Sequence, residues 1–379
     1  SRKGFKQLKV LLLSDAYSIH TIKWAKSLSK KEIEIAIFSL NCNENEVNPY
    51  QQNNSIKVYY CIDKNAKKRS SGFAKLSYLS ALPALKKVIK EFKPDIVHAH
   101  YASSYGLLGA LADFHPFIIS VWGSDVFDFP NISFLHKVII KYNLSKADKI
   151  LSTSKVMAIE TNKYTDKKVV VTPFGIDLDK FKPVKVNTLF DKNDIVIGTV
   201  KTLEEKYGIE YLIKAFAIVK DKHKYLPLKL LIVGAGSLST ALKKLTYDLG
   251  IEKDTVFTGK IAHELVPFYD NMLSVSVSVS VSNSESFGVA VIEASACGKP
   301  VVVSDVGGLP EVVKDGITGI VVPPRNPQKT AEAIEKLVLD EKLCKQMGED
   351  GRKRVAKFYD WNKNVEQMIE IYENILNIK

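Results

Sequence analysis

Short apolar runs alternate with helical patterns along this chain, and the alternation begins twice. In the first half, residues 8–14 and 33–39 have the length and composition of buried parallel strands, with helical spacing between them. In the second half, residues 194–200 restart the pattern, and the alternating Ser and Val of 273–281 predict a strand with one apolar and one small polar face. Alternating strands and helices predict a doubly wound parallel sheet, so we expect an α/β protein with two such sheets.

Turn and breaker residues between the two patterns give the expected domain boundaries. We expect a first domain over residues 1–172, a linker over 173–190, a second domain over 191–358 and a C-terminal helix over 359–379 that packs back on the first domain. In open α/β sheets, ligands bind beyond the carboxyl ends of the strands. Loops that follow strands in both halves should therefore hold the chemistry.

The composition excludes several classes of protein. Of 379 residues, 46% are hydrophobic and 25% charged, which are globular rather than disordered values. No apolar run approaches the roughly 20 residues of a membrane-spanning helix. The cysteines lie far apart without a CxxC pair, which argues against a disulfide framework or a structural zinc site and favours the reducing cytoplasm. They are Cys42, Cys61, Cys297 and Cys344.

The densest candidate site lies in residues 282–300. A strand ends near Val281, a polar loop holds Glu285, and a helix is expected to begin around Phe287. Free backbone N–H groups at a helix start bind phosphate. Glu293 would lie two turns inside that helix, where its carboxylate accepts hydrogen bonds from vicinal hydroxyls. Two glutamates eight residues apart on a solvated helix are the alternative interpretation.

Glu285-x7-Glu293, within Glu-Ser-Phe-Gly…Glu-Ala…Gly-Lys-Pro, resembles the signature of the retaining glycosyltransferases of family 4. Residues 173–183, 201–208 and 304–323 resemble further segments of that family. The resemblance implies the GT-B fold, in which two Rossmann-like domains face each other across a cleft.

The resemblance also implies roles for individual residues. Glu293 would bind the nucleotide ribose, Glu285 the transferred sugar, and Lys206 and Lys201 the donor diphosphate. Lys201 stands where the family usually has arginine. A lysine there keeps the positive charge but cannot donate the two parallel hydrogen bonds of a guanidinium group. Fixed cations stabilise a leaving diphosphate without a metal, so we expect no metal and no cofactor besides the nucleotide sugar. We interpret Asp177-Leu-Asp179 as structural.

Further residues of the second half are expected near the nucleotide. Val233-Gly-Ala-Gly236 is a glycine turn after a strand, without the third glycine of a dinucleotide fingerprint; a tight strand–helix turn is the alternative. The loop after 255–258 holds the base through backbone groups in this family. The expected nucleotide-binding residues besides Glu293 are Ser286, Phe287, Gly288, Val289, Gly234, Gly236, Lys260 and Ile261.

In the first half, polar and aromatic residues follow strands at the edge where the acceptor and the donor sugar are expected. Trp122 stands where the family commonly has a histidine, and His100 and His20 are the candidates to approach the same place. A satisfied structural histidine is the alternative for either. With Gly123 they form the expected acceptor-binding set, and Asp125 is the expected catalytic contact to the sugar or acceptor.

The leading function is transfer of a sugar from a UDP- or GDP-sugar to a glycan or lipid-linked acceptor with retention of configuration, in cell-surface polysaccharide synthesis. A nucleotide-sugar epimerase of similar fold, a phosphorylase, a glycosidase and a nucleic-acid-binding protein are weaker alternatives. The sequence has no signature of a nucleic-acid-binding module, so no nucleic-acid partner is expected.

The net charge of +12 lies wholly before Lys185. Lysines scattered over solvated helices explain such an excess, and so does an anionic partner. Five cations of 64–75 surround apolar Phe73 and Leu76. Many relatives use lipid-linked acceptors, so we expect an enzyme that lies in the cytoplasm, peripheral to the inner face of the membrane, with this loop on anionic lipid.

Overall fold

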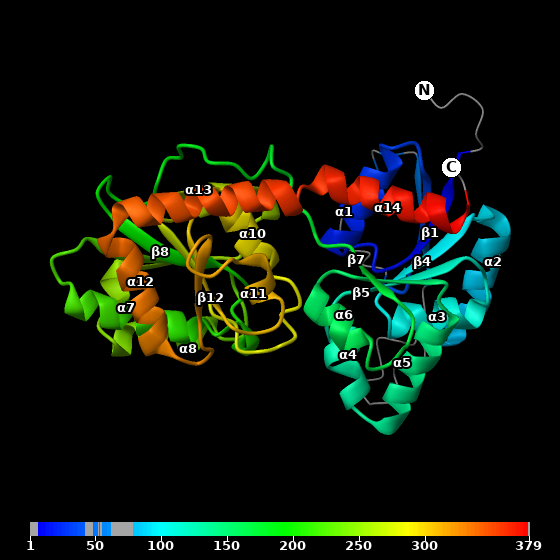
Figure 1. Cartoon of the computed structure of the whole chain (residues 1–379), viewed down its shortest axis with the longest axis horizontal. Helices are drawn as coiled ribbons and strands as arrows, with labels where there is room; N and C mark the ends of the chain where they lie inside the picture. Colours follow the sequence, from blue (N-terminus) through cyan, green and yellow to red (C-terminus); the bar gives the residue numbers. More distant parts are fainter. Residues whose placement is uncertain (1–6, 42–47, 52, 54, 62–78, 378–379) are drawn as a thin grey trace. The chain divides into compact units, whose positions relative to one another are not determined.

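The computed structural model divides the chain into two compact units (Figure 1). Unit 1 comprises Ser1–Thr172 with Val365–Lys379, and unit 2 comprises Pro173–Asn364. The structure describes residues 7–41, 48–51, 53, 55–61 and 79–377. The basic segment 64–75, expected to contact lipid, lies outside the described residues, as does Cys42. In the described part of the chain, no helix is long and apolar enough to cross a membrane.

Unit 1 is built on a seven-stranded parallel sheet with helices connecting the strands. Its strands, in spatial order, are β3 (Ile56–Tyr60), β2 (Glu34–Ser39), β1 (Lys9–Leu13), β4 (Ile96–His100), β5 (Phe117–Val121), β6 (Lys149–Ser152) and β7 (Val169–Val171). Its helices are α1 (Ile19–Ser29), α2 (Leu82–Phe92), α3 (Ser104–Ala112), α4 (Ser124–Phe127), α5 (Phe134–Lys146), α6 (Lys155–Thr161) and most of α14 (Trp361–Ile375), with a short 3-10 turn η3 (Phe129–Asn131) before α5.

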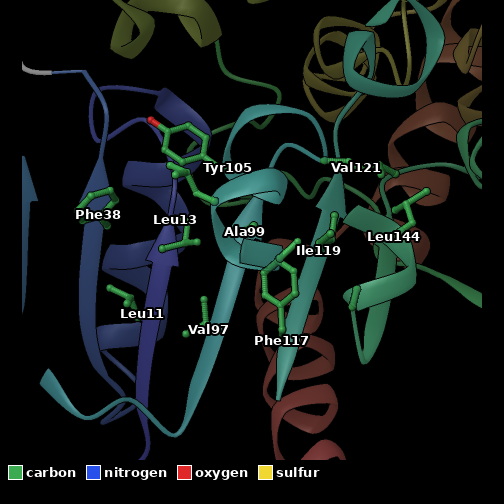
Figure 2. Packing of buried hydrophobic residues seen from close by; sticks show 14 of the residues in the cluster. Leu11, Leu13, Phe38, Val97, Ala99, Tyr105, Phe117, Ile119, Val121 and Leu144 are labelled. Carbon is green, nitrogen blue, oxygen red and sulfur yellow. The ribbon is translucent and has the colours of Figure 1, made fainter. Parts of the chain in front are cut away.

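Burial on both faces explains why the central strands of unit 1 are continuous apolar runs. Figure 2 shows Leu11, Val97 and Ile119 from adjacent strands in one cluster of buried side chains. In α3, Gly109 faces the ring of Phe117, and a Cβ atom at that position would overlap the ring. The helix therefore lies directly on the sheet at the start of β5.

Unit 2 repeats the architecture with a six-stranded parallel sheet. Its strands, in spatial order, are β10 (Thr255–Gly259), β9 (Leu228–Val233), β8 (Ile195–Val200), β11 (Val275–Ser278), β12 (Val301–Ser304) and β13 (Gly319–Val322). Its helices are α7 (Ile209–Lys222), α8 (Ser239–Asp248), α9 (Val266–Met272), α10 (Val289–Ala296), α11 (Leu309–Val312), α12 (Pro327–Leu339) and α13 (Glu341–Phe358), with 3-10 turns η4 (Glu205–Tyr207), η5 (Glu252–Asp254) and η6 (His263–Leu265). Two doubly wound parallel sheets confirm the expected fold class.

The strand expected over 273–281 is shorter in the structure. β11 ends at Ser278 because the backbone beyond it finds other partners. The carbonyl of Ser280 accepts from the Ser304 hydroxyl, and the N–H of Val281 donates to the carbonyl of Lys206. The expected polar face is also buried, since Ser276 is 5% exposed and packs within the unit. This departure from the ladder brings residues 280–285 over the end of β8.

The helix α14 continues the chain from unit 2 into unit 1. At its start, Asn364 donates from Nδ2 to the carbonyl of Pro173, within unit 2. Further on, Gln367 donates to the carbonyl of Val171, within unit 1, and Tyr372 is fully buried there. The last turns of the helix are thus part of the unit 1 core.

Candidate functional site

The glycine turn after β9 positions the segment that follows β8. The N–H of Lys201 donates to the carbonyl of Val233, and the N–H of Leu203 donates to that of Ala235. A Cβ atom at Gly234 would overlap the carbonyl oxygen of Lys201, and one at Gly236 would overlap that of Leu203. Gly234 also has a φ of 138°, which side chains rarely adopt. The two glycines therefore let the backbone of Lys201 lie directly against the turn.

Lys201 and Glu285 form the central ion pair of this edge. Their Nζ and Oε2 atoms lie 2.8 Å apart, and the side chains are only 18% and 11% exposed. Burial alone would lower the pKa of Lys201, but the Glu285 carboxylate, Tyr207 and the more distant Glu293 outweigh it and raise that pKa. Lys201 is therefore a firmly charged cation at the carboxyl end of β8.

A second lysine, Lys206, lies close to the same tyrosine ring, that of Tyr207, as Lys201 does. The ring centroid lies 4.3 Å from Nζ of Lys201 and 4.9 Å from Nζ of Lys206. Lys206 is exposed and lines a pocket of about 690 Å³. The other lining residues are Glu204, Glu205, Val281, Ser282, Asn283 and Arg325. Lys201 is thus partly buried and ion-paired, whereas Lys206 faces solvent beside a pocket.

The loop after β12 packs closely against the backbone of the loop that holds Glu285. The N–H of Gly308 donates to the carbonyl of Glu285 at 2.8 Å. A Cβ atom at Gly307 would overlap that same carbonyl oxygen, and one at Gly308 would overlap that of Ser286. Gly307 has a left-handed φ of 50°. The loop after β12 therefore fixes the backbone on which Glu285 stands.

The helix α10 begins at Val289, two residues beyond the expected start around Phe287, and carries Glu293. Gly288 caps it in the left-handed region (φ 92°), and Val289 is its first residue. Phe287 is 2% exposed, and its ring packs against Phe174 and Tyr359. The side chain of Phe287 is thus part of the core of unit 2, and only its backbone is available for a ligand.

Glu293 is held by a histidine that sequence reasoning missed. Its Oε1 atom lies 3.2 Å from Nε2 of His263, and the carboxyl is 8% exposed. His263 follows β10 in the same loop as Lys260, which is exposed, and Ile261, which packs against apolar neighbours of the sheet. The rule that chemistry follows strand ends would have singled out His263, because it is four residues beyond β10.

A second carboxyl lies behind Glu293. Asp270 on α9 is 2% exposed, and its Oδ2 atom has no hydrogen-bond partner among the described residues. Burial and the charge of Glu293 raise the pKa of Asp270 well above its usual value, against the opposing effect of Lys299. Burial and the nearby Glu293 therefore disfavour a second negative charge at this corner of the site.

In unit 1, the expected acceptor-binding residues come together at the carboxyl ends of β1, β4 and β5. The ring of His100 lies 4.6 Å from that of Trp122, and the ring of His20 from α1 lies 5.6 Å from the same indole. Nδ1 of His100 is 3.2 Å from the Ser14 hydroxyl. Burial, with His98 and His20 nearby, lowers the pKa of His100 well below its usual value, so the ring is neutral.

Asp125 lies beneath this cluster rather than in it. It is fully buried, and its carboxylate accepts from the N–H groups of Ala102 at 2.7 Å and Gly123 at 2.8 Å and, more weakly, of Trp122. Burial raises the pKa of Asp125, while these backbone hydrogen bonds lower it. The carboxylate therefore fixes the loops after β4 and β5, including the strained Gly123 (φ 147°).

Of the two carboxylates of Asp177-Leu-Asp179, the first caps a turn. Oδ1 of Asp177 accepts from the N–H groups of Asp179 at 3.0 Å and Lys180 at 3.2 Å. The carbonyl of Asp177 accepts from Phe181. This arrangement matches the structural interpretation of the motif.

Two family models match the chain. The model described as glycosyl transferases group 1 matches residues 181–354, and the model described as glycosyl transferase 4-like matches residues 9–154. The chain belongs to the group 1 glycosyltransferases. Each matched range lies within one of the two units, so the family models cover both sheets. The fold of this glycosyltransferase is GT-B.

Relatives of this glycosyltransferase extend over the whole chain. The uncharacterized glycosyltransferase MJ1178 of Methanocaldococcus jannaschii is 28% identical over 97% of this chain and 99% of its own. The N-acetyl-alpha-D-glucosaminyl L-malate synthase of Bacillus anthracis is 28% identical over 74% of this chain and 75% of its own. Anabaena Alr3699/HepE, solved in complex with UDP, has a TM-score of 0.79 at 17% identity and covers 97% of this chain and 100% of its own.

Proposed function

We propose that this glycosyltransferase moves a hexosyl group from a UDP- or GDP-sugar to a glycan or lipid-linked acceptor, with retention of anomeric configuration. The observation that carries the proposal is the partly buried Lys201–Glu285 pair, with Lys206 and Glu293 in the same site, because the four residues combine cations for a diphosphate with carboxylates for hydroxyl groups. The complexes of Anabaena Alr3699/HepE with UDP and with UDP-glucose support a nucleotide-sugar donor.

In this proposal the residues of unit 2 bind the donor. Glu293 accepts hydrogen bonds from the ribose hydroxyls, and His263 orients the carboxylate by its contact with Oε1. Glu285 binds hydroxyls of the transferred sugar. Lys206 and Lys201 neutralise the charge that develops on the leaving diphosphate, and the backbone N–H groups at the start of α10, from Gly288 onward, add to it.

Retention follows from front-face attack in this scheme. The leaving phosphate takes the acceptor proton as the new glycosidic bond forms on the face from which the phosphate departs. Unit 1 supplies the acceptor surface through Trp122, His100 and His20, and Asp125 is a positioning residue for the loop that bears Trp122 and Gly123. A neutral His100 donates or accepts one hydrogen bond without adding charge.

The wider biological proposal is synthesis of cell-surface polysaccharide by an enzyme in the cytoplasm, peripheral to the inner face of the membrane. The net charge of +12 supports an anionic partner. The epimerase, phosphorylase, glycosidase and nucleic-acid-binding alternatives receive no support from the two family models, since both describe glycosyl transferases.

A panel of UDP- and GDP-sugars tests the donor. Wild-type protein should release nucleotide from one of them in the absence of acceptor, and Glu285→Gln should reduce that release at least a hundredfold. Glu332→Gln, which removes an exposed surface carboxylate on α12, is the matched control and should leave the release unchanged. Nuclear magnetic resonance of a transfer product then gives its anomeric configuration. Hydrolysis of none of the sugars, or an inverted product, would contradict the proposal.

A further inference from the structure

Exposed apolar side chains gather on α5 and the turn before it. Phe134 is 83% exposed, Leu135 61%, Ile132 55%, Val138 42% and Tyr142 38%. Large exposed apolar groups are ordinary when scattered, but a contiguous group of them marks an interaction surface. We call these five residues, together with Lys137 and Lys141, the α5 surface.

The opposite side of the same helix is anchored in unit 1. Ile140 and Leu144 are fully buried, and Nδ2 of Asn143 donates to the carbonyls of Ala102 and Ser103. At about 100° per residue, the exposed apolar residues of α5 lie opposite this buried face. In Figure 1, α5 lies with α4 at one edge of unit 1. The apolar stripe is therefore held outward by the fold and is not a frayed end.

The charged residues of α5 have one sign, and the most C-terminal of them, Lys146, pairs with Asp113, whose Oδ1 atom lies 3.6 Å from its Nζ. From Phe129 to Ala147 the sequence contains Lys137, Lys141 and Lys146 and no Asp or Glu. The helical spacing places the first two lysines along one side of the stripe and the third along the other. Within the described residues, neither Lys137 nor Lys141 forms an ion pair, so both charges are available to an anionic partner.

We propose that the α5 surface docks unit 1 on an anionic lipid bilayer, with Phe134 and Leu135 inserted below the headgroups and the flanking lysines on lipid phosphates. Apolar side chains that enter the acyl boundary, bordered by lysines that stay at the headgroups, are the pattern of an interfacial helix. This inference rests on the proposed function only for its biological purpose, which is to bring unit 1 to a lipid-linked acceptor. It assigns the membrane contact to α5, independently of the segment 64–75.

Sedimentation with vesicles tests the docking. Wild-type protein should bind phosphatidylglycerol–phosphatidylcholine vesicles at low salt and should not bind pure phosphatidylcholine. Each lysine near an anionic surface is worth about a fivefold change in partition, so Lys137→Gln/Lys141→Gln should weaken binding roughly 20–30-fold. Phe134→Ser/Leu135→Ser should weaken it at least tenfold. The matched controls lie in unit 2: Lys342→Gln/Lys345→Gln on exposed positions of α13, and Tyr225→Ser, whose side chain is 75% exposed.

A direct depth measurement separates insertion from attraction at a distance. The fluorescence of Leu135→Trp should shift to shorter wavelength on acidic vesicles and be quenched by brominated acyl chains. Tyr225→Trp should do neither. Thermal melting of every variant should match wild type, since all the replaced side chains are exposed, and this excludes misfolding as the cause of a loss.

Three results would overturn the docking proposal. The first is wild-type protein that remains in the supernatant with acidic vesicles at low salt. The second is binding of both α5 double variants at the wild-type level. The third is a wild-type dimer that Phe134→Ser/Leu135→Ser dissociates, which would make the surface a contact between copies. Donor hydrolysis, measured on the same variants, tests the proposed function separately. Vesicle binding without any hydrolysis would contradict the glycosyl-transfer scheme but would still support the docking proposal.

Discussion

Nδ1 of His98 and the hydroxyl of Tyr372 lie 2.7 Å apart in the core of unit 1, although 274 positions separate them in the chain. Nε2 of the same ring lies 2.7 Å from the Ser120 hydroxyl, so both ring nitrogens have partners. Burial lowers the pKa of His98 to about 3. This neutral histidine joins α14 to the strands β4 and β5, and its ring lies 4.7 Å from that of His100.

Acid should destabilise unit 1 through these two histidines. In the folded state His98 and His100 stay neutral, whereas in the unfolded chain both bind a proton below their ordinary pKa of about 6.5. Stability is therefore full above pH 6.5 and falls as the pH drops toward 3. At pH 5 His98 alone should lower the free energy of unfolding by about 2 kcal/mol, and His100 acts in the same direction.

Urea titrations at pH 7 and pH 5 measure this loss. Because buried Asp125 titrates with the opposite sign, the comparison is made between variants. His98→Gln should reduce the loss between the two pH values by about 2 kcal/mol, while His136→Gln, on the partly exposed surface of α5, should keep the wild-type loss. Equal losses in all three proteins would refute a neutral His98.

Replacing Glu293 by alanine should weaken nucleotide binding. Two hydrogen bonds to a carboxylate disappear, each worth about 1.5–3 kcal/mol, so the dissociation constant should rise by two to four orders of magnitude. Calorimetric titration with UDP and with GDP measures it. His263→Ala should have a smaller effect in the same direction, because the carboxylate remains but loses its contact. A Glu293→Ala protein that binds nucleotide like wild type would remove the ribose role.

The two lysines should differ when each is replaced by alanine. Lys206 is exposed, so Lys206→Ala should lower turnover by about 10²–10³ and leave the melting temperature unchanged. Lys201→Ala leaves the partly buried Glu285 without its counter-charge and should also cost about 1–3 kcal/mol of stability. Turnover and melting of both variants are measured beside Lys342→Ala as control. Normal turnover in Lys206→Ala would exclude it from the diphosphate site.

Activity should survive EDTA. In the proposed scheme, the charges of Lys201 and Lys206 and the backbone N–H groups at the start of α10 take the place of a metal as counter-charge to the diphosphate. Turnover is measured before and after chelation, then after addition of Mn²⁺ or Mg²⁺. Activity that disappears and returns with the metal would overturn this expectation, and Asp177→Asn would then show whether that carboxylate is involved.

The fold was predictable because its signal is local. Buried parallel strands must be apolar on both faces, so runs such as 8–14 and 194–200 can be recognised from the sequence alone. The strands β1 and β8 lie within these two runs. The error at 273–281 has a tertiary cause: Ser280 and Val281 leave the ladder for Ser304 and Lys206, which are distant in sequence. Alternation in the sequence cannot reveal that exchange of partners.

The sequence predicted which positions belong to the candidate site, but it did not predict which contacts their side chains make. Strand ends identified Glu285 and Trp122, the family resemblance identified Lys201, and the structure brings Lys201 and Glu285 together. Whether a carboxylate faces a ligand or its own backbone depends on the fold around it. Asp125 illustrates this, since its N–H partners come from loops after two different strands. The His263–Glu293 contact likewise joins two elements 30 residues apart.

The passage of α14 from unit 2 into unit 1 bears on the order in which the protein folds as it is made. Unit 2 is one continuous stretch, Pro173–Asn364, and all of its strands have been synthesised before α14 is complete. Unit 1 begins first but needs Val365–Lys379, which brings Tyr372 to His98. On the ribosome, Nδ1 of His98 therefore lacks its Tyr372 partner until the second unit has been synthesised, and a fragment of residues 1–172 should expose that side of the ring to solvent and to chaperones.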